Sequence, residues 1–303
     1  MRSTGRQTVP DSPALESGLP TGVADSCELV EAAAWTDVVQ AVSEQPGNTL
    51  GAHLSHAGVV PLPMVSALDY GPFNRVVGLG TGQAATEGQV DEIIHVYDGA
   101  GLSRYVISLS PLARPTELPD WFSARRFARG ATVAKLWRDL APPLEPTTDL
   151  RIELVTKSDP EAWARIQRAA WGMPAAMTAW FTAAVGREGW LHYLGFVGST
   201  PVAAAAMYVS NGVGWLGFGA TAPSYRHLGH HSGLISRRIR DAADLGCSML
   251  VSETGEDSPR TPNPTFHNLV RHGFQLAYHK QDYTPGPDGE HRLRRDRDAR
   301  PGS

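Results

Sequence analysis

The sequence has little of what a disulfide-stabilised, membrane-spanning or nucleic-acid-binding protein requires. Its 303 residues include two cysteines, Cys27 and Cys247, which are too few for a disulfide framework. The longest nearly apolar run, 202–209, is too short to cross a bilayer, and the first residues contain no apolar signal core. A formal net charge of −4 provides no overall basic field, which disfavours binding to nucleic acid or to an anionic membrane. Together these absences predict a cytoplasmic protein.

Lysine is also scarce, whereas arginine, alanine, glycine and proline are abundant. The chain has 24 arginines and 3 lysines, a usage typical of GC-rich bacterial genomes. Hydrophobic residues make up 42% of the chain and charged residues 19%, so the chain can bury substantial cores. At roughly 150 residues for each domain, a chain of this length predicts two domains.

Composition divides the chain into four parts. Residues 1–26 are rich in serine, proline, glycine and threonine and lack periodicity, which predicts a disordered tail. Residues 285–303 mix both charges with proline and glycine, which predicts a second disordered tail rather than a nucleic-acid-binding segment. Three prolines within 141–146 interrupt any helix or inner strand and mark a linker. The two domains are therefore expected at 27–145 and 146–284.

The two expected domains show the same order of elements. In each, a helical segment ends at a glycine before a strand, and a second helical segment leads into another strand. Gly101 and Gly246 lie 145 residues apart, and Phe127 and Phe274 lie 147 apart. A nearly constant offset favours two copies of one α/β unit, and the alternative is a coincidence of common α/β patterns. In the first domain the elements are expected at 89–101, 102–110, 120–127 and 128–139.

The pattern of the second domain predicts a mixed, mostly antiparallel sheet flanked by helices. The expected fold class is α/β, with the strands and helices arranged as in α+β proteins. Short turns join its first apolar segments into antiparallel hairpins, whereas the sequence after 221 changes to strand, turn and helix. Strands are expected at 189–197, 201–209, 213–221, 247–253 and 275–283, and helices at 160–172, 176–186, 233–246 and 265–274.

The segment 222–234 carries the clearest chemical signal, because a strand ends, a tight turn follows and a helix begins within it. A helix N-terminus offers unpaired amide N–H groups and the positive end of the helix dipole. Gly229 lets a ligand approach the backbone closely, and Arg226 adds a charge that can bind phosphate oxygens. The pattern predicts a pyrophosphate site. The glycine-rich segment 78–82 lacks the spacing of a dinucleotide site.

At this segment the chain resembles the GNAT superfamily of acyl-CoA N-acyltransferases. The pyrophosphate loop of that family reads Arg/Gln-x-x-Gly-x-Gly/Ala, and this chain has Arg226-His-Leu-Gly229-His-His231, with histidine at the last small position. The pair Ser252-Glu253 at the end of the next strand continues the resemblance, as does the Asn-to-Gly-Phe segment 263–274. The resemblance covers 150–284 well. Residues 28–140 resemble a degenerate copy, as in tandem-GNAT proteins.

The resemblance implies an N-acetyltransferase that transfers an acetyl or other short acyl group from acetyl-CoA to a small-molecule amine by direct attack. At an offset of 145, Arg226 corresponds to Thr81 and Gly229 to Ala84, so the first copy is expected to be a scaffold or a wall of the substrate site that holds no CoA. The residues expected to bind acetyl-CoA are Ala220, Thr221, Arg226, Leu228, Gly229, His230, His231, Ser232, Asn263, Phe266 and Asn268.

Amine acetylation requires a base for the amine, donors for the oxyanion and a proton for the departing thiolate. Glu253 is the candidate general base, with a structural ion pair to an arginine as the alternative. A backbone N–H near Ala220-Thr221 is the expected oxyanion donor. The family's usual acid, a tyrosine, is replaced by Leu269, which leaves His267 and Tyr278 as candidate acids.

Other interpretations remain open from the sequence alone. A non-catalytic acyl-CoA-binding or regulatory protein would also contain the loop, and His231 and the missing tyrosine favour it. His227, His230 and His231 have a spacing that suits a zinc site, but no carboxylate or thiolate lies close in sequence, and no metal is expected. The acceptor amine and the oligomeric state, a homodimer included, cannot be deduced from these residues.

Overall fold

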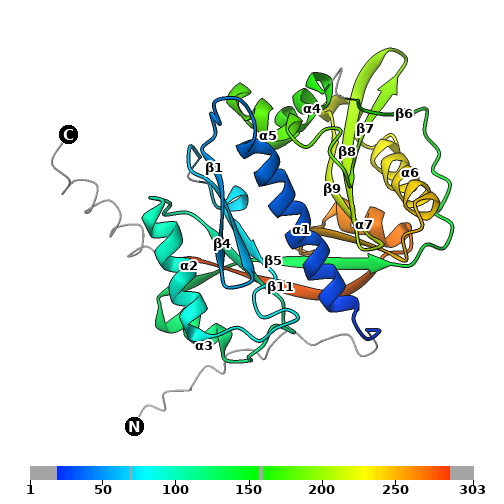
Figure 1. Ribbon diagram of the computed structural model, residues 1–303. Helices are drawn as coiled ribbons and strands as arrows, with labels where there is room; N and C mark the ends of the chain where they lie inside the picture. The colour runs from blue at the N-terminus through cyan, green and yellow to red at the C-terminus, as the bar shows by residue number, and fades with distance from the viewer. Residues whose placement is uncertain (1–18, 69, 157–159, 287–303) are drawn as a thin grey trace, which may run out of the picture.

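The computed structural model describes residues 19–68, 70–156 and 160–286 (Figure 1). Most of the two predicted tails, 1–18 and 287–303, lies outside the described residues. The inner end of each predicted tail is part of a regular element, which corrects the prediction there. Helix α1 begins at Val23, and strand β11 ends at Pro285. Within the described ranges, no helix is both long and apolar enough to cross a membrane.

A nine-stranded mixed sheet forms the centre of the molecule, and this confirms the predicted fold class. Neighbouring strands are antiparallel except for two parallel pairs, β3 with β4 and β9 with β10. Across the sheet the order is β3 (Arg75–Val77), β4 (Val106–Leu109), β11 (Gln275–Pro285), β5 (Phe127–Arg138), β10 (Met249–Gly255), β9 (Val213–Thr221), β8 (Thr200–Ser210), β7 (Trp190–Val197) and β6 (Arg151–Leu154). A separate antiparallel pair consists of β1 (Ala52–Ala57) and β2 (Val60–Val65).

Helices cover both faces of this sheet, and α1 crosses the face that is turned to the viewer in Figure 1. The described α-helices are α1 (Val23–Ser43), α2 (Glu87–Gly99), α3 (Leu118–Ala124), α4 (Glu161–Trp171), α5 (Thr178–Thr182), α6 (His230–Asp244) and α7 (Pro264–Arg271), with short 3-10 helices η1 (Gly71–Phe73), η2 (Ala175–Met177) and η3 (Pro223–Tyr225). The ends of β7, β8 and β9 agree with the predicted strands within one residue. The single helix predicted at 176–186 is instead divided into η2 and the short α5.

Each half of the chain contributes its last strand to the other half. Strand β5, from the first half, pairs with β10 from the second half. Strand β11, from the second half, pairs with β4 from the first half and also with β5. The two halves therefore share one continuous sheet, in which β5 and β11 each pair with strands of the other half.

The order of elements after β3 matches the order after β9. In both, a helix connects two parallel strands and a second helix leads into a long strand. The ends of α2 and α6 correspond at the predicted offset of 145, but their N-caps, Thr86 and Gly229, lie 143 residues apart. Helix α6 is two residues longer at its start, so the offset of 145 does not align the residues that open the two helices.

Helix α1 is not among the predicted elements, although its apolar residues recur at helical spacing. Cys27, Val30, Ala34 and Val38 are all buried. They belong to one core cluster with residues of α4, α5, β8 and β9, while the same cluster also includes residues of β1 and β2. Helix α1 therefore packs against elements from both halves.

A network of buried charges lies between α1 and the central strands. Lys135 of β5 contacts Glu31 of α1 and lies 3.0 Å from Glu253. Lys280 of β11 lies 2.9 Å from Glu31 and 3.2 Å from Glu28. Burial alone would lower the pKa of Lys135, but the surrounding carboxylates outweigh it and raise that pKa. The lysine is therefore charged at neutral pH, and the network joins α1 to strands of both halves.

Candidate active site

The turn that opens α6 has the backbone conformation that a close approach requires. Gly229 is the N-cap of α6 with a φ of 79°, and His227 two residues earlier also has a positive φ, of 65°. A Cβ at position 229 would lie 2.5 Å from the carbonyl oxygen of Thr147. The packing of the protein therefore requires glycine at position 229, because Thr147, which follows the linker, lies directly against the turn.

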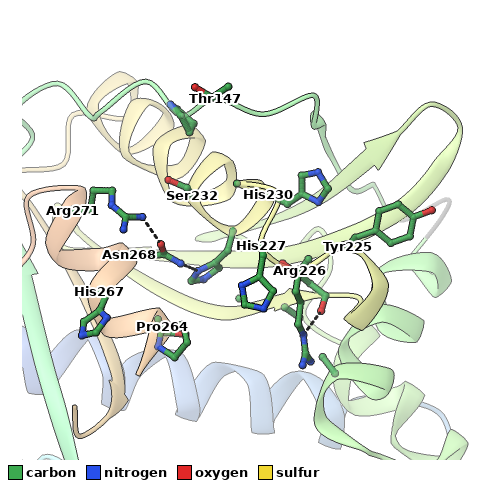
Figure 2. A pocket seen from close by; sticks show the side chains of 18 of the residues that line it. Thr147, Tyr225, Arg226, His227, His230, Ser232, Pro264, His267, Asn268 and Arg271 are labelled. Atoms are coloured by element: carbon green, nitrogen blue, oxygen red, sulfur yellow. Dashed lines mark hydrogen bonds between the residues drawn. The ribbon is translucent and has the colours of Figure 1, made fainter. Parts of the chain in front are cut away.

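A cavity of about 980 Å³ opens in front of this turn (Figure 2). Its walls come from the end of β9, the N-terminus of α6, helix α7, the linker and the last residues of α4. The lining residues include Leu144, Thr147, Trp171, Gly219, Ala220, Thr221, Tyr225, Arg226, His227, Gly229, His230, His231, Ser232, Pro264, Thr265, His267, Asn268 and Arg271.

The linker predicted at 141–146 forms one wall of the cavity, because hydrogen bonds hold it in place. Ser236 donates a hydrogen bond to the carbonyl of Leu144 at 2.7 Å, and Arg138 donates to the carbonyl of Ala141. His230 lies 3.0 Å from Asp149 on the far side of the linker. These contacts hold the segment, which has no regular structure of its own, against α6 and the end of β5.

Strands β9 and β10 separate beside the cavity. Their parallel pairing ends at Leu216 and Ser252, although β9 continues to Thr221 and β10 to Gly255. A register shift in the pairing of β9 with β8 coincides with Phe218, whose φ is 53°. Beyond Leu216, the edge of β9 that faces β10 is therefore free of strand pairing, although the carbonyls of Gly217 and Phe218 accept hydrogen bonds from the side chains of Arg238 and Gln167.

The helix N-terminus and its surroundings fit an anionic group. No side chain caps α6, so the first amides of the helix are not satisfied by a capping residue. Arg226 is exposed, and its Nε donates a long hydrogen bond of 3.4 Å to the carbonyl of Thr221. Among the described residues, the buried hydroxyl of Thr221 at the cavity wall has no hydrogen-bond partner. The first residues of α6, Arg226 and Thr221 all line this one cavity.

Most of the residues expected to bind acetyl-CoA line this cavity. Ala220 and Thr221 end β9, Arg226 and Gly229 form the turn, and Asn268 lies across from them on α7. The first three residues of α6 complete the group, namely His230, His231 and Ser232.

Three of the expected binding residues lie elsewhere. Leu228 is exposed and does not line the cavity. Asn263 caps α7: its Oδ1 accepts from the amides of Thr265 and Phe266, at 3.0 and 3.2 Å. Phe266 packs against the hydrophobic core. Asn263 and Phe266 support the site through the fold, because the capping amide and the half-buried ring already have partners within the protein.

The three loop histidines do not converge. His230 pairs with Asp149 and His231 with Asn268, while His227 is exposed in the turn. Within the described residues, no group of three histidine, cysteine, aspartate or glutamate side chains has the arrangement of a metal site.

Glu253 belongs to the buried charge network and does not line the cavity. Arg75 Nη1 lies 2.6 Å from its Oε1, and Lys135 and Lys280 lie 3.0 and 3.5 Å from its Oε2. Burial alone would raise the pKa of Glu253, but Lys135, Lys280 and Arg75 outweigh burial and hold it well below its usual value. Such a carboxylate is a weak base, so the environment corresponds to the structural ion pair that the sequence leaves as the alternative.

The two candidate acids occupy different environments. Tyr278 is buried under α1, donates a 2.8 Å hydrogen bond to Glu28 and has a pKa raised well above 10 by burial and by Glu28. It does not line the cavity, and its proton is already engaged. His267 does line the cavity and lies 3.0 Å from Asp257. Of these two candidates, only His267 therefore lies where it can exchange a proton with a ligand in this cavity.

Several lining residues are not among the predicted binding residues. Thr147 comes from the linker, Tyr225 from η3, Trp171 from the end of α4 and Arg271 from the end of α7. Proline content predicts the linker, but no local pattern shows that it folds back onto α6. Among these residues, Trp171 is the one that a helical pattern could have indicated. It ends an amphipathic helix, and it is 56% exposed.

No family model matches the sequence, and no curated protein matches it. Solved structures do match its fold. A GCN5-related N-acetyltransferase from Kribbella flavida is 17% identical with a TM-score of 0.62, over 88% of this chain and 97% of that protein. A tandem GNAT protein from the clavulanic acid biosynthesis pathway is 15% identical with a TM-score of 0.54, over 86% and 93%.

A third likeness, to a GCN5-related N-acetyltransferase from Sphaerobacter thermophilus, is 14% identical with a TM-score of 0.53 and covers 92% of this chain and 98% of that one. Each of these likenesses extends over both halves of the chain. The chain therefore has the fold of the GNAT acyltransferases, in the form in which two units share one chain, as the resemblance in the loop predicts.

Proposed function

We propose that this protein is an acyl-CoA-dependent N-acyltransferase, with acetyl-CoA as the acyl donor and a small-molecule amine as the acceptor. One observation carries the proposal: the uncapped N-terminus of α6, with Arg226 beside it, opens into a cavity that borders the separation of β9 and β10. A phosphate site next to a free strand edge suits a ligand with an anionic end and an extended amide-bearing arm.

Each part of the site would act on a different part of the donor. The amides of α6 and Arg226 would bind the pyrophosphate through charge-assisted hydrogen bonds. The unpaired edge of β9 would hold the arm as a further strand would, and an amide near Ala220 would stabilise the oxyanion. The donor supplies a thioester that an amine can attack directly. As the C–N bond forms and the C–S bond breaks, the amine nitrogen loses a proton, and His267, paired with Asp257, would pass a proton to the departing thiolate.

The first half would serve as scaffold, because the N-terminal amides of α2, the helix that corresponds to α6, already have capping partners. Thr86 caps α2 by accepting from the amide of Gln89, while the side chain of Gln89 accepts from the amide of Thr86. Two of the amides that α6 leaves open are thus satisfied in α2 by the helix itself. We propose that only the α6 end binds CoA.

An assay of CoA release from acetyl-CoA over a panel of amines tests the function. We expect at least one amine to stimulate thiol release, and CoA to raise the melting temperature, since a ligand that binds only the folded state stabilises it. Stabilisation by CoA without turnover on any amine would favour the non-catalytic acyl-CoA-binding alternative. If CoA gives no stabilisation and no amine gives turnover, the proposal is overturned.

The variant Glu253→Gln tests the role of the carboxylate. Because its pKa is held well below the usual value, Glu253 stays ionised across the neutral range, and its titration lies below that range. We therefore expect the pH profile of kcat/KM from about pH 6 to about pH 9 to keep its shape in the variant, whatever its height. An ascending limb that disappears with the carboxylate would instead restore Glu253 as the general base.

A further inference from the structure

The imidazole of His231 bridges two walls of the cavity. His231 is the second residue of α6, and its ring lines the cavity. On one side its Nδ1 lies 3.2 Å from Nδ2 of Asn268 on α7. On the other side its Nε2 faces β9, where a Cβ on Gly219 would lie 2.9 Å from it. The ring thus stands between the phosphate-binding turn and the unpaired end of β9.

A chain of two hydrogen bonds fixes which nitrogen of the ring carries the proton. Arg271 Nη1 donates to Oδ1 of Asn268 at 3.0 Å (Figure 2). A guanidinium can only donate, so the amide oxygen faces Arg271 and the amide nitrogen faces His231. That nitrogen also only donates, so Nδ1 of His231 accepts and carries no proton. The ring is therefore protonated at Nε2.

The protonated nitrogen faces β9 beside Gly219 with its hydrogen bond unused. Within the described part of the chain, Nε2 of His231 has no hydrogen-bond partner. Burial, with Arg238 and His272 nearby, lowers the pKa of His231 to about 4, so the ring is neutral at pH 7. A neutral N–H donor that points at a strand edge is suited to an amide carbonyl rather than to a phosphate, which Arg226 and the helix amides already serve.

We propose that His231 binds the pantetheine arm of the acyl donor by donating its Nε2–H to an amide carbonyl of that arm beside Gly219. Asn268 and Arg271 are positioning residues that hold the required tautomer. The inference rests on the proposed function and deepens it. Histidine at the last small position of the loop thereby adds a side-chain contact to the arm, while the backbone amide of the same residue remains available to the pyrophosphate.

Calorimetric binding to two ligands separates this role from the role of the loop. CoA contains the arm, whereas adenosine 3′-phosphate 5′-diphosphate keeps the diphosphate and lacks the arm. We expect His231→Ala to weaken CoA binding by about 3- to 10-fold, as for the loss of one neutral hydrogen bond, and to leave the affinity for the armless nucleotide within about twofold. His231→Gln keeps a donor of similar reach and should recover part of the loss.

Each outcome decides between the inference and the proposed function. Equal losses for both ligands, or no loss for either, would overturn the role of His231 while the phosphate site stands. Wild-type protein that binds neither ligand would overturn both. Nitrogen NMR of the histidine-labelled wild-type protein provides an independent readout: a ring protonated at Nδ1 instead of Nε2 would also overturn the inference. Asn268→Leu, which removes the donor to Nδ1, should lose CoA affinity and the fixed tautomer together.

Discussion

Replacing Lys135 by methionine is expected to lower the free energy of unfolding by about 3–5 kcal/mol, because it breaks a buried ion pair and leaves Glu31 and Glu253 with one fewer buried cation. Lys135 and Glu31 have no exposed side-chain surface, and Glu253 lies 3.0 Å from the same ammonium group. Without Lys135, the charges of Glu31 and Glu253 would be balanced only by Lys280 and Arg75, in a site with little water. Urea unfolding of the wild type and the variant measures the loss.

Two further variants show that the loss comes from the buried charge. Arg151→Ala removes a pair whose side chains are both more than half exposed, and we expect it to cost less than about 1 kcal/mol. Lys135→Met combined with Glu31→Gln removes one anion together with the cation and should recover part of the loss. A cost below about 1 kcal/mol for Lys135→Met alone would contradict the role of the network.

The pH dependence of this contribution follows from the direction of the shift. The carboxylates raise the pKa of Lys135 in the folded state above its value in the unfolded chain. The stabilisation is therefore fully present below about pH 10, the ordinary value for lysine, and is lost as the pH rises through the folded value. At neutral pH the full effect of the substitution should be observed.

The buried lysines also show where sequence patterns stop being informative. Lys135 and Lys280 lie within strand patterns that predict β5 and β11 correctly, and they are 145 residues apart, the same offset as Gly101 and Gly246. Since lysine is scarce in this chain, that coincidence marks the positions as special. Their partners Glu28 and Glu31 come from α1, whose position over the central strands depends on tertiary packing that no local pattern records.

Local patterns predicted the turn that opens α6 well because its geometry is local. A strand end, a positive-φ glycine and a helix start occupy neighbouring residues, and the structure places Arg226 and Gly229 at one cavity wall. Glu253 shows the opposite case. Its place at the end of β10 was predictable, but its three cations come from β3, β5 and β11. The exchange of β5 and β11 between the halves, which brings these strands together, is a non-local result of the fold.

Reversing the charge at position 226 is expected to cause the largest loss of ligand affinity. Arg226→Ala removes one charged hydrogen bond, worth about 1.5–3 kcal/mol, which corresponds to about 10-fold or more in the dissociation constant of CoA. Arg226→Glu adds repulsion of the pyrophosphate, and we expect a total loss of roughly 100-fold at low salt. Because Arg226 is exposed and makes one long hydrogen bond, neither variant should change the melting temperature of the free protein.

Salt and a matched control isolate the local charge. The additional loss in Arg226→Glu should shrink as ionic strength rises, since exposed charges are screened within about 10 Å at 0.1 M salt. Arg165→Glu makes the same change of charge on the exposed face of α4, away from the cavity lining, and should leave CoA affinity nearly unchanged. If both variants weaken binding equally, the protein's overall charge governs the affinity. If neither variant weakens CoA binding, the pyrophosphate does not bind at the α6 turn, and the main support for the proposed function is removed.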